Sequence, residues 1–319
     1  MDINYLLFLQ DFRGNINDLL TPFMEGISHF AVTYLMLVPT LIYWCLDKKK
    51  GLYTICSYCI TITVNAIVKL TACIYRPWIR DPRVIPAGDA ITESTGYSFP
   101  SGHTATATPM YAGIGITFWK KTKSVAVICI LLIALTGFSR NYLGVHTPQD
   151  VFVAIVISIA TLIGVHKLFQ YLEKNPDKED MFLLIGVIFC IAALFYISFK
   201  GYPMDYVDGK LMVDPKKMMV DGYGDIGKLL AFCLGRYVEK HFIGFVPAGL
   251  STKGIIVSVA GIIPLFLIYK VLPGIFASLM GAHFGKLFAH AVLIFFVIAA
   301  WPAVIKMIMK KQDLKTANA

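Results

Sequence analysis

The chain is built from apolar segments that are long enough, or nearly long enough, to cross a lipid bilayer as helices. A membrane-spanning helix needs about 20 predominantly apolar residues. Segments of this kind lie at residues 28–46, 51–75, 104–119, 124–139, 149–171, 181–199, 254–272 and 287–306. A further segment, 226–247, is less apolar because it carries Arg236, Glu239, Lys240 and His241. If it crosses fully, the pattern predicts an all-α, polytopic membrane bundle of about nine transmembrane helices.

The composition supports this prediction. Of the 319 residues, 57% are hydrophobic and 15% are charged, whereas soluble domains have roughly 45–50% apolar and about 25% charged residues. This excludes an ordinary cytosolic enzyme, a disordered chain and a nucleic-acid partner. The net charge of +9 is interpreted as loop charge that fixes membrane orientation. The CxxC pair Cys56 and Cys59 has no second pair or nearby histidine to complete a metal site.

The distribution of lysines predicts which loops face the cytoplasm. Basic residues follow the first, third and fifth apolar segments, at 48–50, 120–123 and 174–178, so these loops are expected inside. The loops at 76–103, 140–148 and 200–226 are then outside. An integral membrane protein of the plasma (inner) membrane is expected, with its polar loops on the extracytoplasmic side.

Four regions follow from this organisation. Residues 1–26 are predicted to form an amphipathic segment at the membrane interface, and residues 27–200 a six-helix core. Residues 201–228 are expected to form an extracytoplasmic loop, and residues 229–319 three further helices and a basic cytoplasmic tail. The apolar contacts of the segment 1–26 are expected from Leu6, Leu7, Phe8, Phe12, Leu19 and Leu20.

In the segment 226–247, Arg236 and Glu239 are three residues apart and are expected to pair.

Polar residues are concentrated in three groups, at 69–76, 100–103 and 139–150, which lie in or beside the predicted outer loops. Lys69 and Arg76 are seven residues apart, which places them on one face if the helix continues. Each group also has a local interpretation. The two cations could reach toward the interface from a helix end. Pro100, Ser101 and Gly102 could simply start a helix, and Asp150 could complete a capping box with Thr147 and Pro148. Arg140 and His146 complete the third group.

Together these groups predict a phosphoryl-binding site. Two guanidinium groups and an ammonium, from Lys69, Arg76 and Arg140, match the oxygens of a phosphoryl group. Backbone amides at Ser101-Gly102-His103, at a helix N-terminus, would add directed donors. No cluster of His, Asp and Glu has metal-ligand spacing, which favours charge neutralisation by side chains and no metal or other cofactor.

The three groups resemble a known signature. Lys69-(six residues)-Arg76-Pro77, Pro100-Ser101-Gly102-His103 and Ser139-Arg140-(five residues)-His146-(three residues)-Asp150 resemble the type 2 phosphatidic acid phosphatase superfamily over residues 60–170. The resemblance implies that His146 is the nucleophile, that Asp150 orients it, and that His103 is the general acid and base. It further implies that the phosphoryl group is bound by Lys69, Arg76, Ser101, Gly102 and Arg140.

The resemblance implies a metal-independent phosphatase acting on a lipid phosphate or diphosphate, with the bilayer and the lipid as partners. Three alternatives stay open: a phosphotransferase, a phosphatase of soluble sugar phosphates, and a non-catalytic lipid transporter.

The charged residues of the 78–97 loop include Arg80, Arg83, Asp89 and Glu93. They could contact a headgroup or be solvated, and the second interpretation is favoured. Aspartates of the 200–228 loop, including Asp208, belong to a lid or an ordinary loop. The sequence does not predict an oligomeric state.

Overall fold

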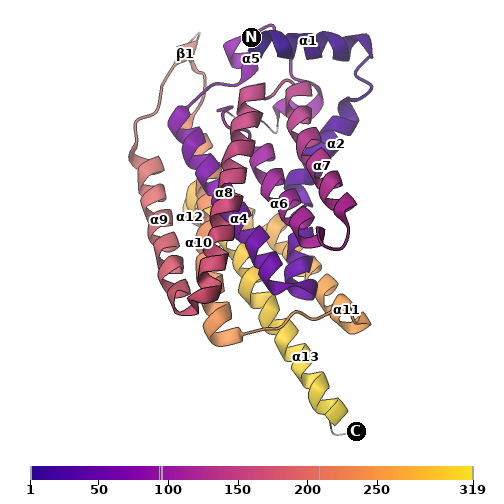
Figure 1. Cartoon of the computed structure of the whole chain (residues 1–319). Helices are drawn as coiled ribbons and strands as arrows, with labels where there is room; N and C mark the ends of the chain where they lie inside the picture. The colour runs from indigo at the N-terminus through magenta and orange to yellow at the C-terminus, as the bar shows by residue number, and fades with distance from the viewer. Residues whose placement is uncertain (1, 93, 95, 208, 318–319) are drawn as a thin grey trace. The chain divides into compact units, whose positions relative to one another are not determined.

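A computed structural model describes residues 2–92, 94, 96–207 and 209–317, so Glu93 and Asp208 lie outside the described residues (Figure 1). The chain divides into two compact units. The first unit comprises Met1–Met36, Ile60–Ile163 and Tyr196–Gly222, and the second comprises Leu37–Cys59, Gly164–Phe195 and Tyr223–Ala319. All residues of the expected phosphoryl-binding site belong to the first unit.

The first unit is mainly helical. α7 packs against α6 and α2, and Tyr142, Leu143 and Val145 form a buried core with Met24 of α2 below the loops that hold the polar residues. Its elements are α1 (Asp2–Asn15), α2 (Thr21–Thr33), part of α4 (Lys48–Ala72), α5 (Pro77–Arg80), α6 (Gly102–Phe118), α7 (Lys123–Tyr142), part of α8 (Pro148–Lys174), the strands β1 (Tyr206–Val207) and β2 (Lys210–Leu211), and the start of α10 (Pro215–Val238).

The second unit contains the rest of α4, α8 and α10 together with α3 (Leu37–Leu41), most of α9 (Glu179–Phe199), α11 (Thr252–Ala260), α12 (Ile262–Phe295) and α13 (Trp301–Ala317). Trp44 is fully buried in this unit and donates a hydrogen bond from Nε1 to the carbonyl of Val297 at 2.8 Å. α12 is interrupted at Gly281, whose φ of 80° and ψ of 167° are not helical.

The helices confirm an all-α, polytopic membrane protein. Within the described residues, six segments are long and apolar enough to cross a bilayer: Thr21–Leu46, Lys48–Ala72, Lys123–Tyr142, Pro148–Lys174, Pro176–Phe199 and Thr252–Lys310. Two predicted spans, 254–272 and 287–306, fall in the last of these. α6 has only 17 residues, and α10 carries several charges. The count of nine crossings therefore stays a prediction.

The N-terminal region differs from a single amphipathic helix. Two helices, α1 and α2, are separated by a turn in which Asn17 and Asp18 have positive φ. Leu6 is buried against the protein, whereas Phe8 and Leu19 are exposed. Arg13 of α1 donates hydrogen bonds to the carbonyls of Tyr142 and Ile85 at 3.1 and 2.8 Å. α1 is thus attached to the loops by polar contacts that an amphipathic pattern does not reveal.

The expected loop 201–228 ends earlier, because α10 begins at Pro215. Asp214 accepts a hydrogen bond from the backbone N–H of Lys216 at 2.9 Å, and Pro215 occupies the first helical position, where its missing N–H has no consequence. The lysines and aspartates between 215 and 228 are therefore helical. A short antiparallel pairing of β1 with β2 occupies part of the remaining loop.

Candidate active site

Lys69 and Arg76 approach the same group of loops by a route that differs from the predicted one. α4 ends at Ala72, and Cys73 has a φ of 49°, so the chain has left the helix before Arg76. The prediction that both cations share a helical face is therefore wrong. Lys69 Nζ instead donates to the carbonyls of Tyr97 and Ser98 at 3.3 and 3.2 Å.

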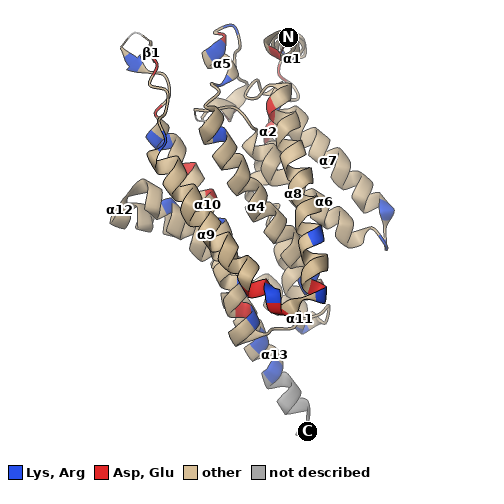
Figure 2. Cartoon of the chain, turned by 60° about the vertical axis from the view of Figure 1, so that its left-hand side comes forward, with Lys and Arg blue, Asp and Glu red and all other residues tan. Residues whose placement is uncertain are grey.

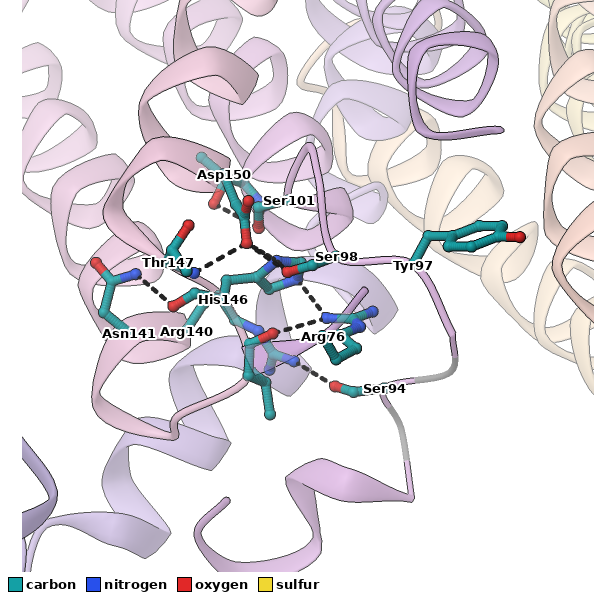
Figure 3. Close-up of polar contacts among 12 residues, drawn as sticks. Arg76, Ser94, Tyr97, Ser98, Ser101, Arg140, Asn141, His146, Thr147 and Asp150 are labelled. Atoms are coloured by element: carbon teal, nitrogen blue, oxygen red, sulfur yellow. Dashed lines mark hydrogen bonds and ion pairs between the residues drawn. The ribbon is translucent and has the colours of Figure 1, made fainter. Parts of the chain in front are cut away.

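The loop that ends at Arg76 places its guanidinium beside His146. Arg76 Nη1 donates to the carbonyl of Val145 at 3.0 Å and lies 2.8 Å from Nε2 of His146 (Figure 3). Arg76 is 6% exposed. A guanidinium donor facing a ring nitrogen requires that nitrogen to accept, which leaves the ring proton on Nδ1.

His146 and Asp150 form a buried pair at the start of α8. Nδ1 of His146 lies 3.2 Å from Oδ2 of Asp150, and their side chains are 1% and 3% exposed. The same carboxylate oxygen accepts a hydrogen bond from the Thr147 N–H at 2.9 Å and another from the Ser98 hydroxyl. The local capping contact and the contact with His146 therefore coexist in one carboxylate, and the Nδ1–H tautomer is held in place.

The electrostatic surroundings of His146 favour its neutral form. Burial, and next the positive charge of Arg76, lower the pKa of His146 well below its ordinary value, although the hydrogen bond to Asp150 acts in the opposite direction. The imidazole therefore carries an unprotonated Nε2 at neutral pH. Such a nitrogen is the form of histidine that can act as a nucleophile.

Arg140 lies in the last turn of α7 and is 1% exposed. Its Nη1 donates to the hydroxyl of Ser28 at 2.5 Å, and its Nη2 donates to the hydroxyl of Ser94 at 3.0 Å. Its carbonyl accepts from the backbone N–H of His146 at 3.2 Å. The backbone of Arg140 therefore helps to position His146, and its side chain supplies a positive charge.

The start of α6 brings in the second group. Ser101 is the N-cap, and its hydroxyl accepts hydrogen bonds from the backbone N–H and the hydroxyl of Thr104 at 3.4 and 2.9 Å. The Ser101 N–H donates to the carbonyl of Asp150 at 3.0 Å, which ties this helix start to α8. At Gly102 an added Cβ would meet nothing within 4 Å. Packing within the described residues therefore does not require glycine at this position.

His103 occupies the first turn of α6. Besides burial, the groups that act electrostatically on its ring are Arg140, His146, Arg76 and Lys69, in that order. The first unit thus brings all of the predicted site residues into one cluster.

Sequence reasoning missed several residues that support this cluster. Ser28 and Ser94 hold Arg140, and Ser98 holds Asp150. Asn141 donates from Nδ2 to the carbonyl of His146 at 2.9 Å. Serine and asparagine are frequent in loops, and nothing in their spacing sets these four apart, so only the folded arrangement identifies them.

Residues 50–174 match the family model of the PAP2 superfamily. This segment of the chain is a PAP2 region. It contains every predicted site residue, and the resemblance stated from the sequence is confirmed. Ser28 of α2 lies outside the matched residues, as does all of α10.

The chain is also similar to several named proteins. A probable sphingosine-1-phosphate phosphatase of Dictyostelium discoideum is 24% identical over 62% of this chain and 50% of its own length. The bacitracin transport permease protein BcrC of Bacillus licheniformis is 22% identical over 56% of this chain and 90% of its own. Phosphatidylglycerophosphatase B of Bacillus subtilis is 28% identical over 51% and 76%. The chain spans only half of the Dictyostelium relative, and no solved structure gives a significant match.

Proposed function

We propose that this protein is an integral membrane phosphatase that removes a phosphoryl group from a lipid phosphate or diphosphate. The observation that carries the proposal is the buried imidazole of His146, held through Nδ1 by Asp150 while Nε2 faces Arg76. Mere binding of an anion needs cations, but it does not need a neutral histidine with a fixed tautomer. Two of the similar proteins are named as phosphatases of lipid phosphates.

In the first step, Nε2 of His146 attacks phosphorus and the bond from phosphorus to the leaving oxygen breaks. Arg76 moves its donor from Nε2 to a phosphoryl oxygen, and Lys69 and Arg140 stabilise the other oxygens as charge develops. Burial, and next the positive charge of Arg140, lower the pKa of His103, so its role as general acid requires the negative phosphoryl group to raise that pKa on binding. His103 in its protonated form then gives its proton to the leaving oxygen. The products are the dephosphorylated lipid and a phosphohistidine whose positive ring is stabilised by Asp150.

In the second step, water attacks the phosphorus of the phosphohistidine. His103, now neutral, takes a proton from the water, and the bond between phosphorus and Nε2 breaks. Inorganic phosphate leaves, His146 returns to its neutral form and His103 is again protonated. The two histidines thus restore their starting states without a metal ion in the cycle.

The surroundings of the site support a lipid substrate and an extracytoplasmic position of the site. Lys69, Arg140 and Asp150 lie at the ends of long apolar helices, where a headgroup can be bound while the lipid tail stays in the bilayer. The lysines at 48–50, 120–123 and 174–178 belong to the other ends of these helices. The lysine bias then favours the extracytoplasmic leaflet of the plasma membrane.

Transport is the second candidate function, favoured by one observation. The chain covers 90% of a relative whose name describes a transport permease. Transport of an anionic lipid would use the cations of the site but would not require His146. The two functions are therefore separable by a change at this residue alone.

The test is phosphate release by the detergent-purified protein in the presence of EDTA. The panel contains phosphatidate, phosphatidylglycerophosphate, undecaprenyl diphosphate, sphingosine phosphate and glucose 6-phosphate. We expect turnover of at least one lipid, and a loss of about three or more powers of ten in H146A. The matched control is H166A, which removes an exposed histidine of α8 and should leave the rate unchanged.

Each other outcome contradicts a defined part of the proposal. Loss of activity in EDTA that added metal restores would overturn the metal-independent mechanism. Turnover of glucose 6-phosphate alone would replace the lipid substrate. Equal rates in wild type and H146A would remove His146 as the nucleophile. Folded protein that binds these lipids and moves them across vesicles without phosphate release would favour transport.

A further inference from the structure

Residues 96–98, together with Ser94, contact three different groups of the candidate active site. Ser94 accepts a hydrogen bond from Arg140, and Ser98 donates one to Asp150. The carbonyls of Tyr97 and Ser98 accept from the ammonium group of Lys69. A displacement of this short segment would therefore move a lysine, an arginine and an aspartate of the site together.

One side of the segment is fixed by residues that precede α5. Tyr97 forms an antiparallel bridge with Tyr75, and the backbone N–H of Ser98 donates to the carbonyl of Ile74 at 2.7 Å. These contacts set the position of residues 96–98 along the neighbouring segment 74–75. A single bridge does not stop the segment from rotating away from Lys69, so a further support is required.

That support comes from the first turns of α10. The Sδ atom of Met218 accepts a hydrogen bond from the Tyr97 N–H at 3.4 Å, and Met218 is 6% exposed. At Gly96, whose φ is +53°, an added Cβ would lie only 2.0 Å from the same sulfur atom. The positive φ therefore favours glycine at 96, and any side chain there would force Met218 to move. The thioether fills this space and accepts the hydrogen bond that the Tyr97 N–H donates.

α10 also contacts the neighbourhood of the cations. A Cβ added at Gly222 would lie 2.8 Å from Cδ1 of Leu70, the residue that follows Lys69. The negative charge of Asp221 acts on Arg76. The loop before α10 is attached by Tyr75, whose hydroxyl donates to Asp205 at 2.5 Å. The helix start that carries Met218 is thus held against the site at several points.

We propose that Met218 is a positioning residue of the reaction: it holds residues 96–98 so that Ser98 and the carbonyls around it fix Asp150 and Lys69. This inference rests on the proposed phosphatase function. Met218 lies outside the matched residues 50–174, so the PAP2 region of this chain uses support from a helix beyond its own boundary. The effect is geometric, since misplacement of a reacting group by about 1 Å can lower a rate about 100-fold.

The first experiment compares M218A, M218L and M204A by kcat and KM. Leucine keeps most of the side-chain volume, so M218L should retain activity within about threefold. M218A should lower kcat about 10- to 100-fold with little change in KM. Met204 lies in the loop that precedes α10 and is 53% exposed, so M204A should match the wild type. A folded M218A with unchanged kcat would overturn the proposal.

A second experiment tests whether Met218 acts through residues 96–98. G96A should lose activity because its Cβ overlaps the sulfur, and G96A/M218A should recover part of that loss. If Met218 acts through Ser98, the loss caused by M218A should also be smaller in an S98A background than in the wild type. The proposal would be overturned if the losses caused by M218A and S98A were fully additive and G96A/M218A recovered no activity.

Binding of orthovanadate, a mimic of the transferring phosphoryl group, separates this proposal from the proposed function. If the wild type releases no phosphate from any substrate, the phosphatase function fails, and the affinity for orthovanadate still tests Met218. About tenfold weaker binding in M218A but not in M204A would support positioning of the cations. Equal affinity in all three proteins, or no binding by the wild type, would overturn it.

Discussion

Two cations of the candidate site and the cations of a charge cluster in the second unit contact different kinds of group. In the first unit, the hydrogen bonds of Arg140 go to the hydroxyls of Ser28 and Ser94, and those of Lys69 go to backbone carbonyls. In the second unit, charges meet opposite charges. Arg236 contacts the carboxylates of Glu179 and Glu239, and Lys48 lies 2.6 Å from Glu239. Figure 2 shows the acidic and basic residues of α9 and α10 intermixed there.

The difference in contact partners distinguishes cations that can bind an anionic ligand from cations that stabilise the fold. A hydroxyl or carbonyl oxygen orients a cation without neutralising its charge, whereas a carboxylate neutralises it. The second unit confirms the predicted pairing of Arg236 with Glu239 and extends it to Glu179 and Lys48. We therefore expect the first cluster to govern activity and the second to govern stability, and the following changes test this division.

The largest effect is expected from Arg140. R140M removes a cation that stabilises the transferred phosphoryl group, and kcat/KM should fall about 10³- to 10⁵-fold, as for other arginines that stabilise phosphoryl transfer. R140K keeps the charge but loses the planar fork that reaches both Ser28 and Ser94, so it should lie between R140M and the wild type. Steady-state phosphate release measures both. If folded R140M keeps activity within about tenfold of the wild type, the expectation that the first cluster governs activity is wrong.

Arg236 should show the opposite behaviour. R236M leaves Glu239, which is 0% exposed, with one cation fewer, and the free energy of unfolding should fall by about 3 kcal/mol. The kcat of the remaining folded protein should not change. Denaturant unfolding in detergent measures the first quantity, and R236M/E239Q should regain part of the stability because the buried charge is gone. A change in kcat without a change in stability would place this cluster in the reaction.

The pH dependence tests the electrostatic part of the comparison. Burial, and next the positive charge of Arg76, lower the pKa of His146, so wild-type kcat/KM should lose activity only well below the ordinary histidine pKa of about 6.5. R76Q removes this charge, raises the pKa of His146 and should move the acidic limb of the profile to higher pH. Titration of the substrate phosphate is common to both proteins and cancels in the comparison. An acidic limb that stays in place would mean that another group titrates.

The sequence predicted the helices better than it predicted the contacts that support the candidate site. Apolar length identifies membrane helices directly, and the spacing of Arg140, His146 and Asp150 survives in the fold because all three lie at adjoining helix ends. The face shared by Lys69 and Arg76 was wrong, because the helix ends at Ala72. No proline or glycine marks that end itself, but Pro77 directly follows Arg76 and disfavours a helical conformation there.

The start of α10 was missed for a different reason. Residues 215–228 contain charges on several sides, so the apolar period that indicates a helix is weak there. Asp214 followed by Pro215 is a local signal for a helix start, but without a clear apolar period after it this signal was not used. Contacts over long sequence separations, such as Ser28 with Arg140 or Met218 with Tyr97, follow from packing and have no sequence signal of their own.

The smallest effect is expected at the outer loop, where the sequence left two interpretations of the charges open. Arg80 Nη2 lies 2.8 Å from Oδ2 of Asp2, and the side chains are 35% and 23% exposed. Partly exposed pairs of this kind contribute about 1 kcal/mol or less, so D2N should change stability by no more than that and leave kcat/KM unaltered. If D2N or R80Q instead changes the ranking of lipid headgroups in the substrate panel, these charges contact substrate, and the cationic site extends beyond the cluster around His146. An unchanged ranking would leave Asp2 and Arg80 outside substrate recognition.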